Sequence, residues 1–288
     1  VFPQMAMTTD IFICIYSEVY NEKIIDSDIQ STFKIIKKFE VDYSRFSKSS
    51  LISKFNNSKG SVKVSDEFFD ILEKSLYYKK ITNGIFDISI LSNLLDEGYV
   101  LSKKDNFYSS ELIINKKDNI MIDFGGIGKG YLIDKIIKFL KNKYYNFCID
   151  IGGDIYCSGS NLKEDDKYWY IDIENPFNEK SINIAKLNNK AIATSGVNKR
   201  VWIKDGEIKN HIINPLTKRS LDNDLISVTV ISENATEADI FAKTLLIMGK
   251  DQGVEYSSNN NLASLLVAKN QDIHVSSEMR KYLYYEAN

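Results

Sequence analysis

The sequence has few of the residues that stabilise small secreted folds, and it has no segment that would cross a membrane. It contains three cysteines and three prolines among 288 residues, and no run of about 18 apolar residues. A chain of this length can bury a large core without disulfides. Cys14, Cys148 and Cys157 share no metal-like spacing, and two of them lie in apolar stretches, so we expect buried free thiols.

The sequence also lacks an excess of charge of either sign. Its formal net charge is −2, from 37 basic and 39 acidic residues. This balance argues against a nucleic acid as the main partner, because nucleic-acid binding needs a basic surface. The first residues form neither a charged leader nor an apolar signal core. The sequence does not begin with Met, so we expect that an upstream segment was removed.

The spacing of apolar residues predicts one α+β or mixed α/β domain, residues 1–288, in which helices cover sheets. Residues 43–64 read as a polar loop. We expect helices at 28–42, 66–81, 129–142, 236–248 and 250–257. We expect strands at 10–17, 119–123, 146–151, 167–174, 191–194, 200–203, 225–232 and 262–268.

The most informative stretch runs from Asp123 to Asp134 and contains four glycines within six residues. An apolar triplet precedes it and an amphipathic run follows, which indicates a strand, a glycine turn and a helix start. Glycine lets the backbone approach an anion, and the first N–H groups of a helix attract one. With the charge of Lys129, this predicts a phosphate or pyrophosphate site. A purely structural turn is the alternative, because neither the Walker loop nor the dinucleotide fingerprint matches.

Four further motifs follow in order, and together they resemble the ApbE-type FAD:protein FMN transferases. The family's Asp-Leu-Gly-Gly-Ile-Ala-Lys-Gly-Tyr is similar to residues 123–131, and its Asn-Leu-Gly-Gly-Asp/Asn to residues 150–154. Its Ser-Gly-x-x-x-Arg is similar to residues 195–200, and its His-Ile-Ile-Asp-Pro to residues 211–215. Its Ala-Asp-x-x-x-Thr is similar to residues 238–243.

Three upstream elements extend the resemblance, which covers about residues 5 to 285. Phe46 with residues 50–56 resembles the family's Phe-Ser…Ser-x-x-Ser-x-x-Asn, and residues 84–89 resemble its Gly-x-Phe-Asp-x-Thr. Residues 5–8 are similar to its opening Met-Gly-Thr. The resemblance implies T-fold-related sheets covered by helices.

The resemblance also implies an activity. Such enzymes cleave the pyrophosphate of FAD, link FMN through its phosphate to a Thr or Ser of an acceptor flavoprotein, and release AMP. An FAD pyrophosphatase and a non-catalytic FAD-binding protein are the alternatives. A flavin carrier is disfavoured, because we find no acceptor motif. The family implies the outer face of the cytoplasmic membrane or the periplasm, with the cytoplasm as the alternative.

The resemblance assigns roles to single residues. His211, one of two histidines, would accept the proton of the acceptor hydroxyl. The carboxylate of Asp239 and the carbonyl of Gly128 would hold Mg²⁺. The residues assigned to FAD binding are Met5, Phe86, Asp87, Ser89, Gly125, Gly126, Lys129, Asp134, Gly152, Gly153, Ser195, Gly196, Arg200 and Lys243. Asp134 could instead contact Lys135 or Lys138, and this alternative stays open.

The sequence departs from the family pattern at three positions. Lys243 replaces the Thr that would bind the metal one turn after Asp239, and positions four apart share a helix face. A protonated Lys cannot ligate Mg²⁺, so the need for the metal stays open. Lys243 could pair with Asp239 and place an ammonium on the phosphates. Asn214 replaces the usual Asp, and Lys218 the usual Gly.

Overall fold

The computed structural model describes residues 1–17, 21–97, 112–116, 120–161, 167–178 and 180–285. These residues divide into two compact units, which we describe separately. Unit 1 comprises Val1–Ile35, Gly128–Lys199 and Asn223–Asn288, and unit 2 comprises Ile36–Ile127 and Arg200–Asp222. The expected mixture of helices and sheets is confirmed, whereas the single domain over residues 1–288 stays a prediction.

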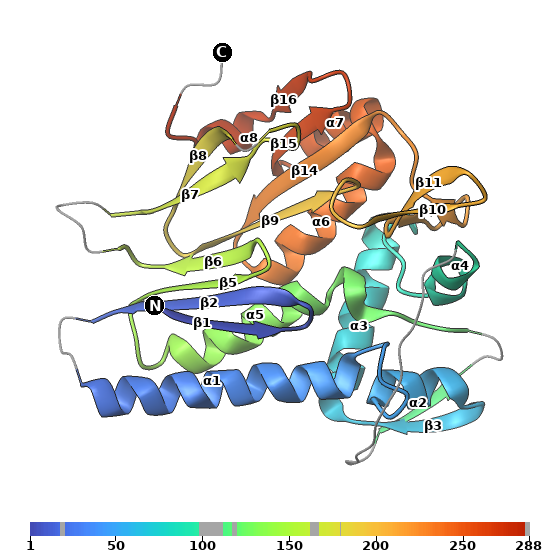
Figure 1. Ribbon diagram of the computed structural model, residues 1–288, viewed down its shortest axis with the longest axis horizontal. Coiled ribbons are helices and arrows are strands. Elements are labelled where there is room, and N and C mark those ends of the chain that lie inside the picture. The colour runs from blue at the N-terminus through green and yellow to red at the C-terminus, as the bar shows by residue number, and fades with distance from the viewer. Residues whose placement is uncertain (18–20, 98–111, 117–119, 162–166, 179, 286–288) are drawn as a thin grey trace. The chain divides into compact units, whose positions relative to one another are not determined.

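An eight-stranded antiparallel sheet forms the centre of unit 1 (Figure 1). The residues of its inner strands are buried almost without interruption, because both faces of the sheet are covered. In spatial order the strands are β1 (Phe2–Ala6), β2 (Thr9–Tyr16), β5 (Asn146–Ile151), β6 (Asp154–Ser158), β9 (Lys190–Gly196), β14 (Leu225–Ser232), β15 (Ala263–Ala268) and β16 (Ile273–Val275).

Helices cover one face of this sheet. Helix α5 (Gly128–Leu140) contacts β5 and β6, and helix α6 (Ala235–Met248) contacts β6, β9 and β14. Helix α7 (Lys250–Asn259) packs against α6 and β15. The two helices α5 and α6 also pack directly on each other. Their first turns therefore lie together.

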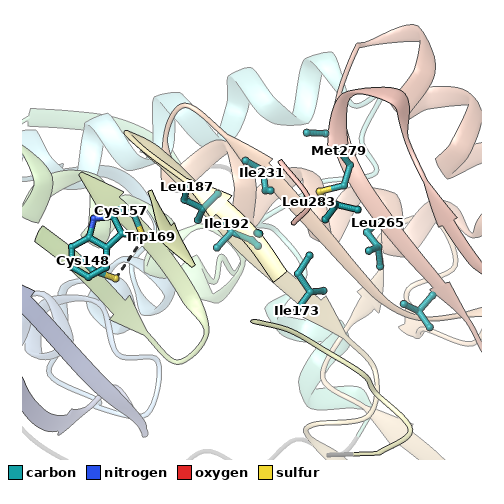
Figure 2. Packing of buried hydrophobic residues seen from close by; sticks show 13 residues of the cluster. Cys148, Cys157, Trp169, Ile173, Leu187, Ile192, Ile231, Leu265, Met279 and Leu283 are labelled. Atoms are coloured by element: carbon teal, nitrogen blue, oxygen red, sulfur yellow. Dashed lines mark hydrogen bonds between the residues drawn. The ribbon is translucent and has the colours of Figure 1, made fainter. Parts of the chain in front are cut away.

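The other face carries the hairpin β7 (Trp169–Glu174) and β8 (Ser181–Leu187), together with the short helix α8 (Ser277–Arg280). Figure 2 shows their buried side chains, including Leu187 and Met279, packed over residues of β9, β14 and β15. The indole of Trp169 donates a hydrogen bond to the carbonyl of Ser158 at 2.9 Å. This face is a dry core rather than a site.

The three cysteines lie in one row across this sheet. Cys14 pairs in register with Cys148, and Cys148 with Cys157, whose sulfurs lie 3.6 Å apart (Figure 2). All three are free thiols, as expected; Cys148 and Cys157 are buried, whereas Cys14 is only half-buried. Burial raises the pKa of Cys14, and the contact with Cys157 together with burial raises the pKa of Cys148, which favours the protonated form of these two thiols.

Unit 2 combines short helices with three two-stranded sheets. Helix α1 (Glu22–Tyr43) begins in unit 1 and ends in unit 2. The other helices of unit 2 are α2 (Leu51–Asn57), α3 (Asp66–Ile81), α4 (Leu91–Asp96) and the 3₁₀ turn η1 (Phe124–Gly126). Its strand pairs are β3 (Gly60–Val64) with β4 (Leu112–Lys116), β10 (Val201–Lys204) with β11 (Glu207–Asn210), and β12 (Ile213–Asn214) with β13 (Arg219–Ser220). An aromatic cluster of Tyr43, Phe55, Phe68 and Phe124 forms its core.

Two sequence expectations about unit 2 are wrong. The polar loop at 43–64 contains α2 and β3, because Ser50 caps α2 and its buried side chains are only Ile52 and Phe55. Of the strand expected at 119–123, residue 119 lies outside the described residues and 120–123 form none. The backbone of Ile122 bonds at 2.8 Å, through both its N–H and its C=O, to the amide side chain of Asn56. That amide takes the place of a neighbouring strand.

Candidate functional site

The first half of the glycine stretch lies in unit 2 over a buried ion pair. Arg45 donates a hydrogen bond to the carboxylate of Asp123, and both side chains are about nine-tenths buried. A Cβ atom on Gly125 would lie 2.8 Å from Asp123 Oδ2 and 2.9 Å from Arg45 Nη1. A side chain at position 125 would therefore force this ion pair to shift. Gly126 ends η1 beside it. Sequence reasoning missed Arg45, although it directly precedes Phe46 of an upstream motif.

The second half of the stretch opens helix α5 in unit 1, starting at the buried Gly128. A Cβ atom on Gly130 would lie 2.4 Å from the carbonyl oxygen of Ala235 and 2.7 Å from the Cα of Thr236. Glycine at 130 thus lets the first turns of α5 and α6 touch. The N–H of Gly130 donates to Asp239 Oδ2 at 3.4 Å. We expected the N-terminus of this helix to bind a phosphate. The N–H of Gly130 instead binds a carboxylate of the protein itself.

Four charged side chains of unit 1 form what we call the charge cluster: Lys129, Asp154, Asp239 and Lys243. Lys129 Nζ lies 2.7 Å from Asp154 Oδ2, and Lys243 Nζ lies 2.9 Å from Asp239 Oδ1. The Asp154 and Asp239 side chains are 2% and 4% exposed, whereas Lys129 keeps 29%. Burial raises the pKa of Asp154 to about 6. Lys129 opposes that shift, and the charge of Asp239 adds to it.

A tight turn places Asp154 in the charge cluster. Gly152 and Gly153, both expected near the ligand, join β5 to β6 with φ of +62° and +87°, values that favour glycine. The N–H of Gly153 donates to Asp150 Oδ1 at 2.8 Å. Burial raises the pKa of Asp150, an effect that this hydrogen bond and Lys129 oppose. Sequence reasoning left Asp154 out of the site, although it directly follows the paired glycines in the motif.

Asp134 has a structural role, and a contact with the ligand stays a prediction. Its carboxylate accepts hydrogen bonds from the backbone N–H of Ala235 at 2.8 Å and of Thr236 at 3.0 Å, and from the Thr236 hydroxyl. It therefore satisfies the first N–H groups of α6. Burial raises its pKa, and these hydrogen bonds oppose the shift.

The candidate ligand residues of the motif at 84–89 hold their own loop together in unit 2. Phe86 is buried, and its N–H donates to the hydroxyl of Thr82 at 3.1 Å. Asp87 Oδ1 accepts from the N–H and the hydroxyl of Ser89, at 2.9 and 2.8 Å. Asp87 Oδ2 pairs with Lys79 Nζ at 2.6 Å. These contacts fix the loop, and a role for its residues in FAD binding stays a prediction.

His211 directly follows the hairpin β10–β11 in unit 2. Its backbone N–H donates to the carbonyl of Arg200 at 3.3 Å, and its side chain is half-buried. The neighbouring Asn210 donates to the carbonyl of Leu221 at 2.8 Å and accepts from the N–H of Ile212 at 3.0 Å. The backbone on both sides of His211 is therefore anchored, which suits a side chain that must keep one position.

The turn after His211 accommodates both smaller departures from the family pattern. Asn214 Oδ1 accepts hydrogen bonds from the N–H groups of Leu216 at 2.9 Å and Thr217 at 3.4 Å. An asparagine oxygen thus supplies the acceptors that an aspartate would give. Lys218 has φ of +60°, a left-handed conformation in which glycine is unstrained and lysine is not.

The remaining expected residues lie on strands, except Arg200, which directly precedes β10, and their contacts with a ligand stay predictions. Met5 lies on β1 and is 73% exposed. Ser195 and Gly196 end β9, opposite Val228 and Ser227 of β14. A Cβ atom on Gly196 would lie 2.9 Å from Asn198 Oδ1, so this glycine makes room for the side chain of Asn198. Arg200 contributes its carbonyl to His211.

The residues at Asp239 do not fit Mg²⁺ as the resemblance implies. A hard cation needs oxygen ligands, and Lys offers three N–H donors and no acceptor. Here Lys243 and the N–H of Gly130 both donate to Asp239, one to each oxygen. Within the described residues no three His, Cys, Asp or Glu side chains converge as metal ligands.

The sequence has matches among known proteins along most of its length. It matches the ApbE family over residues 7–266. It is 26% identical to the FAD:protein FMN transferase of Vibrio cholerae, over 98% of this chain and 91% of that protein. It is 32% identical to the FAD:protein FMN transferase of Buchnera aphidicola subsp. Schizaphis graminum, over 78% of this chain and 74% of that protein.

The fold also has solved counterparts. The Pseudomonas stutzeri flavinyl transferase ApbE in its apo form superposes with a TM-score of 0.85 at 18% identity, covering 99% of this chain and 97% of that one. At this identity the likeness shows a shared fold alone. Within the described residues, no helix has the length and apolar character that a membrane span requires.

Proposed function

The chain belongs to the ApbE family, and we infer from that membership and its relatives that it is an FAD:protein FMN transferase. The hydroxyl oxygen of an acceptor Thr or Ser attacks the phosphorus on the flavin side of FAD. The bond from that phosphorus to the bridging oxygen breaks, and AMP leaves with that oxygen. The proton of the hydroxyl passes to a base of the enzyme. The products are FMN, bound to the acceptor through its phosphate, and AMP.

The charge cluster of unit 1 is the single observation that best supports a site for the pyrophosphate. We propose that Lys129, which keeps 29% of its side chain exposed at the start of α5, contacts the phosphate oxygens. Positive groups held rigidly near such oxygens stabilise the charge that develops during transfer. The glycine turns of the same motifs, including Gly152 and Gly153, are proposed to lie along the ligand.

We propose that His211 is the base. An imidazole changes protonation near neutral pH, so it can accept the hydroxyl proton during the attack. Its backbone is anchored through Arg200 and its neighbours, as described above. Phe86, Asp87 and Ser89 are proposed to line the flavin or adenine part of the site, and Met5, Ser195 and Gly196 the rest of the FAD contacts.

Hydrolysis of FAD to FMN and AMP uses the same groups with water in place of the hydroxyl. The names of the relatives favour transfer over hydrolysis. The partner is then a flavoprotein that presents a Thr or Ser in a flavinylation motif. By resemblance we propose that this reaction takes place at the outer face of the cytoplasmic membrane or in the periplasm.

The two reactions separate in a test of AMP release. The chain is incubated with FAD while the concentration of an acceptor domain that carries the motif is varied. A transferase releases AMP in proportion to the acceptor supplied, and the same domain with its motif Thr or Ser replaced by Ala supports none. Release of AMP at the same rate with and without acceptor would instead identify a pyrophosphatase.

A further inference from the structure

Position 243 is where this chain departs most from its family, and its side chain is fixed in the charge cluster. Lys243 lies one turn after Asp239 on α6, and its side chain is 17% exposed. Its Nζ donates to Asp239 Oδ1 at 2.9 Å, while Gly130 N–H donates to Oδ2. Both oxygens of the expected metal ligand therefore already accept hydrogen bonds from the protein.

The balance of charge explains what the lysine changes. With a neutral Thr at 243, the cluster would contain one ammonium, that of Lys129, and two buried carboxylates, Asp154 and Asp239. Its net charge would be negative, and buried negative charge needs a cation. With Lys243 the two ammonium groups balance the two carboxylates. The cluster is then neutral before any ligand binds, and a divalent ion at Asp239 would be repelled by the ammonium beside it.

We propose that the Lys243 ammonium is a built-in replacement for the divalent cation, and that this chain binds the pyrophosphate of FAD without Mg²⁺. The inference rests on the proposed function, because it concerns the same site. An ammonium held mostly buried by Asp239 is already positioned, so little side-chain freedom is lost when the phosphates arrive. Together with Lys129 it offers two positive groups to a ligand that carries two negative charges.

The test measures binding rather than turnover. Affinity for FAD is measured by flavin fluorescence, in chelator and in Mg²⁺, for the wild type and for Lys243→Thr. Uptake of Mn²⁺ by the free protein is followed by electron paramagnetic resonance. Lys250→Thr is the matched control, because Lys250 is also a helical lysine and also pairs with an aspartate, Asp272, at 2.9 Å, on the surface.

We expect wild-type affinity for FAD to change less than about twofold between chelator and Mg²⁺, and the wild type to take up no Mn²⁺ at this site. The affinity of Lys243→Thr for FAD should fall about tenfold or more in chelator, as expected for the loss of a charge-assisted contact, and it should recover in Mg²⁺. It should also bind one Mn²⁺. Lys243→Met, which removes the charge and adds no oxygen, should lose affinity without recovery.

Several results would overturn the proposal. They are stoichiometric Mn²⁺ uptake by the wild type, a tenfold gain of wild-type affinity in Mg²⁺, or a Lys243→Thr variant that behaves like Lys250→Thr. The wild-type measurements decide even if the variants do not fold. AMP release is assayed separately. FAD binding that is independent of metal, with no AMP released and no FMN transferred to the acceptor domain, would refute the proposed function and leave this inference standing.

Discussion

Replacing Gly130 with Ala tests whether close contact between α5 and α6 builds the charge cluster. The new Cβ would lie 2.4 Å from the Ala235 oxygen and 2.7 Å from the Thr236 Cα. Ordinary contacts of a Cβ atom begin at about 3.4 Å, so the helices must separate by about 1 Å, since backbone atoms cannot swing aside. Overpacking of this kind typically costs about 1–3 kcal/mol, against about 1 kcal/mol gained from the better helix propensity of Ala.

We therefore expect Gly130→Ala to lower stability by up to about 2 kcal/mol. For a protein of this size that is a fall of up to roughly 8 °C in Tm. FAD affinity should also fall, because Lys129 and the hydrogen bond to Asp239 move with the first turn of α5. Calorimetry and flavin fluorescence measure the two effects.

Gly253→Ala in α7 is the matched control. Its Cβ would meet Leu245 O at 3.1 Å and Leu266 Cδ2 at 3.2 Å, a milder overlap with the last turn of α6 rather than its first. It should cost less stability and leave FAD affinity unchanged. If Gly130→Ala is as stable as the wild type and binds FAD equally well, or if both variants lose FAD affinity equally, the close contact of α5 and α6 does not build the charge cluster.

Three further predictions concern single side chains. His211→Ala should lower the rate of FMN transfer roughly 10²–10⁴-fold with FAD affinity retained, and a normal rate would remove His211 from the reaction. Burial raises the pKa of Asp154 from 3.8 to about 6. Between these two pH values the folded protein keeps a proton on Asp154 that the unfolded chain loses, so the free energy of unfolding falls as the pH rises. The Tm of Asp154→Asn relative to the wild type should therefore increase from pH 4 to pH 7, and a difference that is constant or shrinks would contradict the shift. Lys218→Gly should raise the free energy of unfolding in urea by about 0.5–1 kcal/mol. Glycine removes the left-handed strain of about 1–2 kcal/mol but adds its own entropy cost on folding. No gain in stability would show that this turn is unstrained.

Periodicity along the sequence predicted the elements whose stability comes from their own buried face. The helix at 66–81 and the strands at 146–151 and 225–232 have the predicted bounds. The ion pair between Asp239 and Lys243 also followed from their spacing on one helix face, and the structure confirms it. In each case the partners are near in sequence or share one repeating pattern.

What the sequence did not reveal depends on partners distant along the chain. Ile122 reads as a strand residue, yet its backbone bonds to a side chain 66 residues away. The three cysteines look unrelated until three strands bring them into register. Asp134 reads as a ligand contact because nothing in its own helix shows that it caps α6. Gly125 and Gly130 look alike in the sequence, but one serves an ion pair and the other a contact between helices.

In the proposed reaction, FMN from FAD becomes covalently attached to an acceptor hydroxyl. Intact-mass spectrometry of an acceptor domain, after incubation with the chain and FAD, detects this attachment when AMP is quantified in the same sample. We expect the acceptor to gain one FMN through a phosphoester, with one AMP released for each adduct. AMP and free FMN in equal amounts with an unmodified acceptor, or intact FAD throughout, would contradict it.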